Sequence, residues 1–478
     1  MEALKVIIPI YFVLFILGGF RNIKMYLLLT GIVTMPFRTT YTIVDVGPYI
    51  GWTNGINISL SDVSFILLFF YLIVKGNKFE GFSRKLTFAS MLLLGSVLLS
   101  LINSTWLRLS FFQAILLVQV FFLYYVVLTA AIETEKELRT VMAMLMVSLI
   151  VQGFFGTAQY LTGRELDIFK TGTPMTEESE EGVITRALGT IGKPNGLAMY
   201  VTPLILLVTA IIMRARGAYR RLGIVAVALG GAALLFSFSR GGWMAFAIAF
   251  LLLLLALSKG RYARAGRPML ALLIAVFVVV LFLGRIEARL LSPEGSEAAQ
   301  DRIYLVKIAW NMIKDSPILG VGANTFMSVI TQYTNSPELR YVYLHMVHNQ
   351  YLLVFAETGL VGIIAFLWFM LACFRESLDC VRRRGSELAQ MVGISVGAGF
   401  IAMAIHMMVD MYASPLCLSL LFVFCSLCAA VKKIESPLPA GQRQAAPAAS
   451  SLVRPAEEAA PPGPSLPVAA PDTPLPIP

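Results

Sequence analysis

Long apolar stretches alternate with short polar loops along almost the whole chain. Each stretch approaches the roughly 20 residues that an α-helix needs to cross about 30 Å of hydrocarbon. The pattern predicts an all-α polytopic membrane protein. The first two stretches are short and are separated only around Arg21 and Lys24, so the number of spanning helices is 12 or 13. The predicted spans are residues 6–20, 25–37, 62–75, 86–103, 111–131, 140–161, 194–213, 222–239, 242–258, 268–284, 348–374, 391–411 and 413–431.

The composition supports a membrane protein and changes the meaning of the net charge. Hydrophobic residues make up 58% of the chain and charged residues only 14%, whereas about 25% of residues are charged in a soluble domain. The net charge of +10 could indicate binding to nucleic acid. The basic residues, however, lie in short loops on one side of the predicted helices, as the positive-inside rule describes. We therefore predict membrane lipids, and no nucleic acid, as partners.

Four basic loops define the predicted orientation in the membrane. They fall on one side when the spans are counted, which makes that side cytoplasmic. By parity, loops 162–193 and 285–347 and the turn at 239–242 face the opposite side. Lys432 and Lys433 place the C-terminal tail in the cytoplasm. The basic loops contain Lys75, Lys78, Arg84 and Lys85; Arg214, Arg216, Arg220 and Arg221; Lys259, Arg261, Arg264 and Arg267; and Arg382, Arg383 and Arg384.

The chain divides by composition into four regions. We expect N-terminal transmembrane helices in 1–180, a core region in 181–375 that includes loop 285–347, and C-terminal transmembrane helices in 376–435. Residues 436–478 are rich in Pro, Ala and Ser, so they should form a disordered tail. All five cysteines come at or after Cys373, outside the loops placed beyond the membrane, so no disulfide framework is expected.

Loop 285–347 should contain a small helical domain lying on the membrane surface. An amphipathic helix is predicted from Glu297 to Lys314, started by Ser296 and stopped by the sequence Asp-Ser-Pro at 315–317. The glycines of 320–322 predict a turn, and a second short helix should cover 324–333.

Residues 340–352 hold two of the three histidines, His345 and His348, at the point where this loop enters an apolar helix. An imidazole can accept a proton at neutral pH, so either histidine could act as a general base. The alternative for His348 is a histidine that caps the helix at the membrane surface. Tyr351 and its neighbouring tyrosines fit an interfacial aromatic belt or a surface on which a sugar stacks. Two histidines are too few for a metal site, and no metal or other cofactor is expected.

Three arginines are predicted on the same side as these histidines. Arg240 lies in a glycine-rich turn, where its guanidinium could bind phosphate oxygens or lie at the lipid surface. Arg302 could belong to a solvated helix face, and Arg186 could pair with nearby glutamates. Together the arginines and histidines favour an anionic, lipid-linked substrate. His406 and Asp410 are four residues apart in a late span, where we favour a structural hydrogen-bonded pair over a proton relay.

Several short motifs in this order resemble the O-antigen ligase and O-antigen polymerase superfamily. The resemblance covers roughly 180–375 and does not separate ligase from polymerase. The motifs are the sequence Gly-Thr-Ile-Gly-Lys-Pro-Asn at 189–195, which contains Lys193 and Asn195, Ser-Arg-Gly-Gly-Trp at 239–243, Arg302 followed by Trp310, Pro-Ile-Leu-Gly-Val-Gly at 317–322, His-Asn-Gln-Tyr-Leu at 348–352, which contains Asn349 and Tyr351, and Glu-Thr-Gly at 357–359.

The resemblance implies a C-type glycosyltransferase-like fold and a site on the periplasmic face of the bacterial inner membrane. It implies metal-independent, inverting transfer of a glycan from undecaprenyl diphosphate to a lipid A core, glycan or protein acceptor. His348 would be the base. Arg240 and Arg302, with Arg186, would bind the diphosphate, and Asn349, Tyr351, His345, Lys193 and Asn195 would support the site.

Three functions compete on these observations. A ligase joins a finished glycan to a distinct acceptor, whereas a polymerase joins lipid-linked repeat units to one another. A secondary transporter would instead use ionisable groups near the membrane midplane, for which His406 and Asp410 are the candidates. A non-catalytic scaffold would leave the arginines and histidines unexplained.

Overall fold

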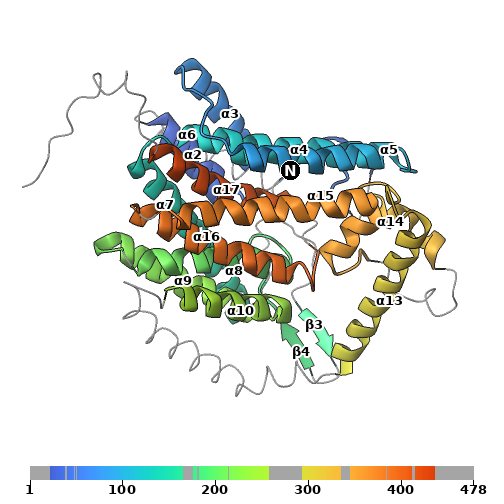
Figure 1. The fold of residues 1–478 in the computed structure, drawn as a ribbon. Helices are drawn as coiled ribbons and strands as arrows, with labels where there is room; N and C mark the ends of the chain where they lie inside the picture. The colour runs from blue at the N-terminus through green and yellow to red at the C-terminus, as the bar shows by residue number, and fades with distance from the viewer. Residues whose placement is uncertain are drawn as a thin grey trace, which may run out of the picture. The chain divides into compact units, whose positions relative to one another are not determined.

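A computed structural model describes much of the chain, and the described part is mostly helical (Figure 1). The chain divides into a unit at Met1–Glu435 and a second unit at Ser436–Pro478. The predicted disordered tail, 436–478, lies outside the described residues. These are 22–37, 40–47, 49, 51–164, 176–179, 182–213, 215–257, 293–334, 345–383, 385–411 and 415–435.

A helix occupies every predicted span that falls on described residues, which confirms the all-α fold class. The spans predicted at 6–20 and 268–284 lie outside this part of the chain. The helices are α2 (Ile23–Thr34), α3 (Leu60–Val74), α4 (Arg84–Ser100), α5 (Leu107–Val120), continued by a π-helical segment (Phe121–Val127) and α6 (Leu128–Ala131), α7 (Glu135–Thr162), α8 (Pro194–Ile212), α9 (Gly217–Phe236), α10 (Arg240–Leu257), α15 (Gln350–Val381), α16 (Glu387–His406) and α17 (Pro415–Ile434).

Length and hydropathy make this a multi-pass membrane protein. Within the described residues, eight helices are long and apolar enough to cross a membrane, and α2 and α3 are shorter apolar helices. Among these eight, α8 and α17 are the most deeply buried in the protein. In each of them, 83% of the residues in the apolar segment are buried. The predicted total of 12 or 13 spans includes residues outside the described part and stays a prediction.

Those basic loops that fall on described residues meet at one end of the helices, which we call the basic end. There Lys24 Nζ lies 3.0 Å from Glu133 Oε2 and 2.5 Å from Glu137 Oε1. Lys433 Nζ donates to the backbone oxygen of Thr129 at 2.8 Å. Glu376 accepts hydrogen bonds from Ser83 and Lys432. These contacts join segments that are far apart in sequence, so the corresponding helix ends lie on the same side of the protein.

The opposite helix ends form a second connected layer, which we call the loop end. Gln350 N donates to Met407 O at 2.9 Å, and Thr190 Oγ1 donates to Pro36 O at 3.2 Å. Ser110 Oγ donates to Ala323 O at 2.6 Å. Gly241, in the predicted turn at 239–242, closely approaches Val409 in the same layer, so this turn shares one end with the described residues just before α8 and α15, as their shared predicted side requires.

The helical domain of loop 285–347 is present but begins earlier than predicted. Its first helix, α13, runs from Pro293 to Asp315, so Ser296 lies inside the first turn and is not the residue before the helix. Proline is favoured at the first helical position because it lacks the N–H that would be unsatisfied there. The second helix is one α-turn, α14 (Phe326–Val329), followed by a 3₁₀ turn (Ile330–Tyr333).

The domain has an apolar core of its own, which joins it to the start of α15. Ile308, Met312 and Phe326 are fully buried in this core with Val347 and Leu353. Because α15 contributes to the same core, α13 and α14 are packed against the helix that follows the histidines (Figure 1).

Two antiparallel hairpins were not predicted. β1 (Thr40–Asp45) pairs with β2 (Gly55–Ser59), and β3 (Thr176–Ser179) pairs with β4 (Gly182–Thr185). Both are short and lie in polar connections, so the hydropathy pattern that identifies spans contains no signal for them.

The α15 helix is interrupted at Gly359, where φ is 64° and ψ is −163°. Tyr351 and Phe366 have ring centroids only 5.8 Å apart, although fifteen residues of straight helix would extend about 22 Å. Residues 350–358 therefore form a short helix folded back against the longer helix 360–381. The longer segment is enough for about 30 Å of hydrocarbon.

Gly359→Ala should destabilise the protein strongly. An added Cβ would meet the backbone of Ile318 at 2.2 Å, and the positive φ disfavours any side chain. We expect a loss of about 2–5 kcal/mol, measured as a lower Tm in detergent. Gly231→Ala is the control, because its Cβ would meet nothing within 4 Å. An unchanged Tm for Gly359→Ala would contradict the interrupted helix.

Candidate functional site

His348 and Asp410 form the centre of the site at the loop end. His348 Nδ1 lies 3.0 Å from Asp410 Oδ1, and their side chains are 23% and 7% exposed. When Nδ1 carries the proton and donates it to the carboxylate, Nε2 is left as the acceptor. A partly exposed imidazole oriented by a buried carboxylate is suited to removing a proton from a hydroxyl.

The second oxygen of Asp410 continues the hydrogen-bonded chain. Asn195 Nδ2 donates to Asp410 Oδ2 at 2.6 Å, and Arg186 donates to Asn195 Oδ1 at 3.2 Å. Arg186 Nε also donates to the backbone oxygen of Ser237 at 3.0 Å. Arg186 thus has partners in two different segments. It links the loop before α8 to the turn before α10 and fixes Asn195.

Burial and charge act in opposite directions on Asp410. Burial raises the pKa of its carboxyl, but the hydrogen bond and charge of His348, with the charge of His406 and the N–H of Met411, bring the pKa below the ordinary value. The carboxylate is therefore ionised near neutral pH. Its stabilising contribution is complete above the ordinary carboxyl pKa and is lost as the pH falls below it.

His345 is a neighbour of His348 and is kept neutral. The two ring centroids are 6.5 Å apart. Partial burial, and then the charges of His348 and Lys193, lower the pKa of His345. Lys193 is exposed and precedes the first residue of α8. It therefore adds positive potential beside the two histidines.

Asn349, not His348, caps α15. Its side-chain oxygen accepts from Leu352 N at 3.0 Å, and its Nδ2 donates to Met408 O at 2.9 Å. The interpretation of His348 as a helix-capping histidine is therefore wrong. Asn349 fixes both the helix start and the turn that carries Asp410, which leaves the His348 ring to face the carboxylate.

Tyr351 stabilises the position of this helix start against α16. Its hydroxyl donates to Ala404 O in α16 at 3.0 Å, and its ring contacts Phe366. The side chain therefore joins α15 to α16, which argues against the sugar-stacking alternative for this tyrosine.

The turn that starts α10 lies against the end of α16. A Cβ at Gly241 would meet Val409 at 2.7 Å and the His406 ring at 3.3 Å. Only a residue without a side chain allows this approach without displacing a neighbour. Arg240, the first residue of α10, is consequently next to the segment that carries Asp410.

Asp410 is not part of the pair predicted with His406. The α16 helix ends at His406, and Asp410 lies in the following turn, where its carboxylate is hydrogen-bonded by His348 and Asn195. The backbone N–H of Asp410 donates to the backbone oxygen of His406 at 2.9 Å. Both residues are at the loop end, so neither is the midplane group that a transporter would require.

Arg302 is the predicted site residue that the described contacts do not connect to this cluster. It is exposed on α13, and no described contact joins it to His348 or Asp410. The structure places its helix at the loop end, in the core shared with α15. Among the described residues, no group of three or more His, Cys, Asp and Glu side chains is arranged to hold a metal ion.

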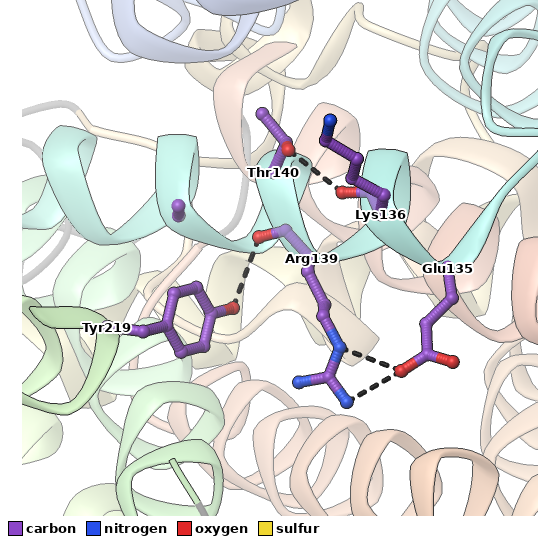
Figure 2. Close-up of a pocket in the computed structure, with 6 residues that line it drawn as sticks. Glu135, Lys136, Arg139, Thr140 and Tyr219 are labelled. Atoms are coloured by element: carbon purple, nitrogen blue, oxygen red, sulfur yellow. Dashed lines mark hydrogen bonds and ion pairs between the residues drawn. The ribbon is translucent and has the colours of Figure 1, made fainter. Parts of the chain in front are cut away.

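A hollow of about 420 Å³ lies between the first turns of α7 and α9, at the basic end (Figure 2). Arg139 binds Glu135 there at 2.7 Å, and Tyr219 donates to the backbone oxygen of Arg139 at 3.1 Å. The side chains of Glu135, Arg139 and Tyr219 are already hydrogen-bonded within its lining, and it lies at the end of the helices opposite His348. We therefore assign the chemistry to the loop end.

Comparison with known proteins supports the same region. Residues 224–367 match the family model described as O-antigen ligase. The match contains Arg240, Arg302, His345 and His348, and it confirms the resemblance to the O-antigen ligase and polymerase superfamily over that stretch. No curated protein matches the chain.

Proposed function

We propose that this multi-pass membrane protein, whose residues 224–367 match the O-antigen ligase family model, transfers a glycan from undecaprenyl diphosphate to an acceptor hydroxyl. The observation that carries the proposal is the 3.0 Å contact between His348 and Asp410. It lies on the side opposite the basic loops, which we assign to the periplasm because positive loops stay in the cytoplasm. The C-terminus is then cytoplasmic.

In the proposed reaction His348 Nε2 removes the proton from the acceptor hydroxyl. The acceptor oxygen attacks the anomeric carbon as the bond from that carbon to the diphosphate oxygen breaks. The leaving undecaprenyl diphosphate takes the bonding electrons, and attack from the opposite face inverts the configuration. Asp410 holds the imidazole and stabilises its charged form, as a buried carboxylate does for a catalytic histidine.

The developing charge on the diphosphate requires fixed positive groups. Arg240 is beside the Asp410 segment, Lys193 is beside His345, and Arg302 is on the packed loop helix. Preorganised positive charge of this kind is often the largest contribution to catalysis. Arg186 acts mainly by fixing Asn195, which in turn fixes Asp410. No metal enters this scheme.

We favour a ligase over a polymerase as the working assignment, because the matched family is described as O-antigen ligase. The acceptor could be a lipid A core, another glycan or a protein. A purified preparation given only the lipid-linked repeat separates the two functions. Growth of the chain would show a polymerase, whereas transfer only after a distinct acceptor is added would show a ligase.

Arg240→Ala should weaken binding of the lipid-diphosphate donor by about 10- to 100-fold, since a hydrogen bond to a charged group contributes about 1.5–3 kcal/mol. The measurement is donor Kd on the purified protein. Arg382→Ala is the matched control, because Arg382 is 75% exposed at the basic end. Equal affinities of the two variants would rule out Arg240 as a diphosphate ligand.

A further inference from the structure

The interruption of α15 is filled by a segment of the loop domain. Val321 N donates to Ala356 O at 3.0 Å, and Gly322 N donates to Glu357 O at 2.9 Å. In the other direction, Leu360 N donates to Pro317 O at 2.8 Å. Groups that would be orphaned by a broken helix are thus satisfied by residues 317–322. The short helix 350–358 and the loop domain are one hydrogen-bonded unit.

The Glu357 side chain is buried within this unit and holds its parts together by hydrogen bonds. It is 3% exposed, and its Oε1 accepts from Phe326 N at 3.1 Å. The backbone of Asn324 and the side chain of Trp52 also hydrogen-bond to it. The carboxyl group therefore holds the start of α14 and the loop before β2 against the end of the short helix.

Asn324 extends the same attachment into the N-terminal half of the chain. Its Oδ1 accepts from Trp52 N at 2.8 Å, and its Nδ2 donates to Thr53 O at 2.7 Å and to Leu109 O at 3.2 Å. Its φ of 59° is unusual for a residue other than glycine. A buried asparagine with this many bonds gives Glu357 a rigid support.

The opposite end of the short helix carries the proposed base. Glu357 is near the end of residues 350–358, and His348 is just before their start. Nine residues extend about 13 Å, so a tilt of about 5° at Glu357 would move the far end by about 1 Å. A misplacement of about 1 Å can cost about 10²-fold in rate. The support of Glu357 is therefore coupled to the placement of His348.

We propose that Glu357 is a positioning residue for the reaction, whose hydrogen bonds to the backbone of Asn324 and Phe326 aim the short helix so that His348 meets Asp410 and the acceptor. The proposal rests on the proposed function. Glu357 touches no reacting atom. It acts through the helix that His348 precedes and through α14, which shares a core with the helix of Arg302.

Two substitutions separate this role from a purely structural one. Glu357→Ala removes the acceptor and should lower kcat by about 10- to 100-fold, with KM for the donor within about threefold. Glu357→Gln keeps an oxygen that can accept from Phe326 N, and kcat should stay within about threefold of wild type. Each rate is divided by the concentration of folded protein. Size-exclusion chromatography and Tm show that the variant is folded.

Glu376→Ala is the matched control. Glu376 is a second buried glutamate of the same helix, 1% exposed, but it bonds to Ser83 and Lys432 at the basic end. Its loss should lower Tm and leave kcat within about threefold. Hydrogen exchange gives a readout independent of activity, since the amides of Val321 and Gly322 should exchange faster in Glu357→Ala than in Glu376→Ala.

The outcomes are distinguishable from those that test the proposed function. A kcat for Glu357→Ala equal to that of Glu376→Ala would overturn the positioning role, and so would a Glu357→Gln variant as slow as Glu357→Ala. His348→Ala is measured in the same assay. Full activity of His348→Ala would instead refute the proposed base, whatever the Glu357 variants do.

Discussion

Substitution of His348 by alanine is expected to lower kcat for glycan transfer by about 10²–10⁴-fold, the usual contribution of general-base catalysis. The imidazole is 23% exposed and hydrogen-bonded to a nearly buried carboxylate, so it is both accessible and oriented. Donor binding should be retained, because the diphosphate is assigned to arginines. Kd for the lipid-linked donor and single-turnover rates on purified protein measure the two effects separately.

His345→Ala is the matched control for that substitution. His345 lies at the same loop end, 6.5 Å from His348 by ring centroids, and a lowered pKa keeps it neutral. It is not the partner of Asp410, so we expect less than about a tenfold change in kcat. A larger loss in His345→Ala than in His348→Ala would exchange the roles of the two residues.

The second large effect is expected for Asp410→Asn, with a fall in kcat of about 10²-fold or more. An asparagine can present its NH₂ group to His348 Nδ1, which would then have to accept. The imidazole would hold its proton on Nε2 and could not take one there. A wrong tautomer of this kind costs about 10⁴-fold in kcat in a serine protease triad. We take that value as the largest fall in kcat to expect for Asp410→Asn.

Asn195→Asp tests the same chain of hydrogen bonds from its other end. Asn195 donates to Asp410 Oδ2 at 2.6 Å, and a carboxylate in its place would repel the one on Asp410. Repulsion raises the pKa of the Asp410 carboxyl, so the acid side of the pH–rate profile should move to higher pH. If Asp410→Asn retained wild-type kcat, or if the Asn195→Asp profile did not move, Asp410 would have no role in orienting the base.

Most of the helical architecture was predictable because lipid imposes a simple rule. Every apolar stretch that the described residues cover is a helix, and the basic loops within the same residues share one end. The placement of His348 and Arg240 at the opposite end followed from the same counting, whereas the choice of His348 over His345 came from the family resemblance. The loop helix was also found, although its start is Pro293 and not Glu297.

The partner of His348 could not be read from the sequence, because it comes from a different helix connection. Asp410 stands four residues after His406, a spacing that predicts a contact along one helix. The helix ends at His406, and the carboxylate turns to His348, 62 residues away in sequence. Only the three-dimensional fold brings these residues together.

The interruption at Gly359 was equally hidden. Residues 348–374 are apolar enough to be predicted as one span, and glycine is tolerated in membrane helices. The sharp bend depends on hydrogen bonds from residues 317–322, which precede α15 by a long stretch of chain. Hydropathy measures each segment separately and contains no information on such docking. The glutamate at 357 within an apolar segment was the one local sign of a polar partner.

The most direct test of the account is a reconstituted transfer reaction with an undecaprenyl-diphosphate-linked glycan and an acceptor, followed by mass spectrometry and NMR of the product. We expect release of one undecaprenyl diphosphate for each new glycosidic bond, inversion at the anomeric carbon, and near-complete loss of both products in His348→Ala. Transfer at the wild-type rate by His348→Ala, or a product with retained configuration, would contradict it.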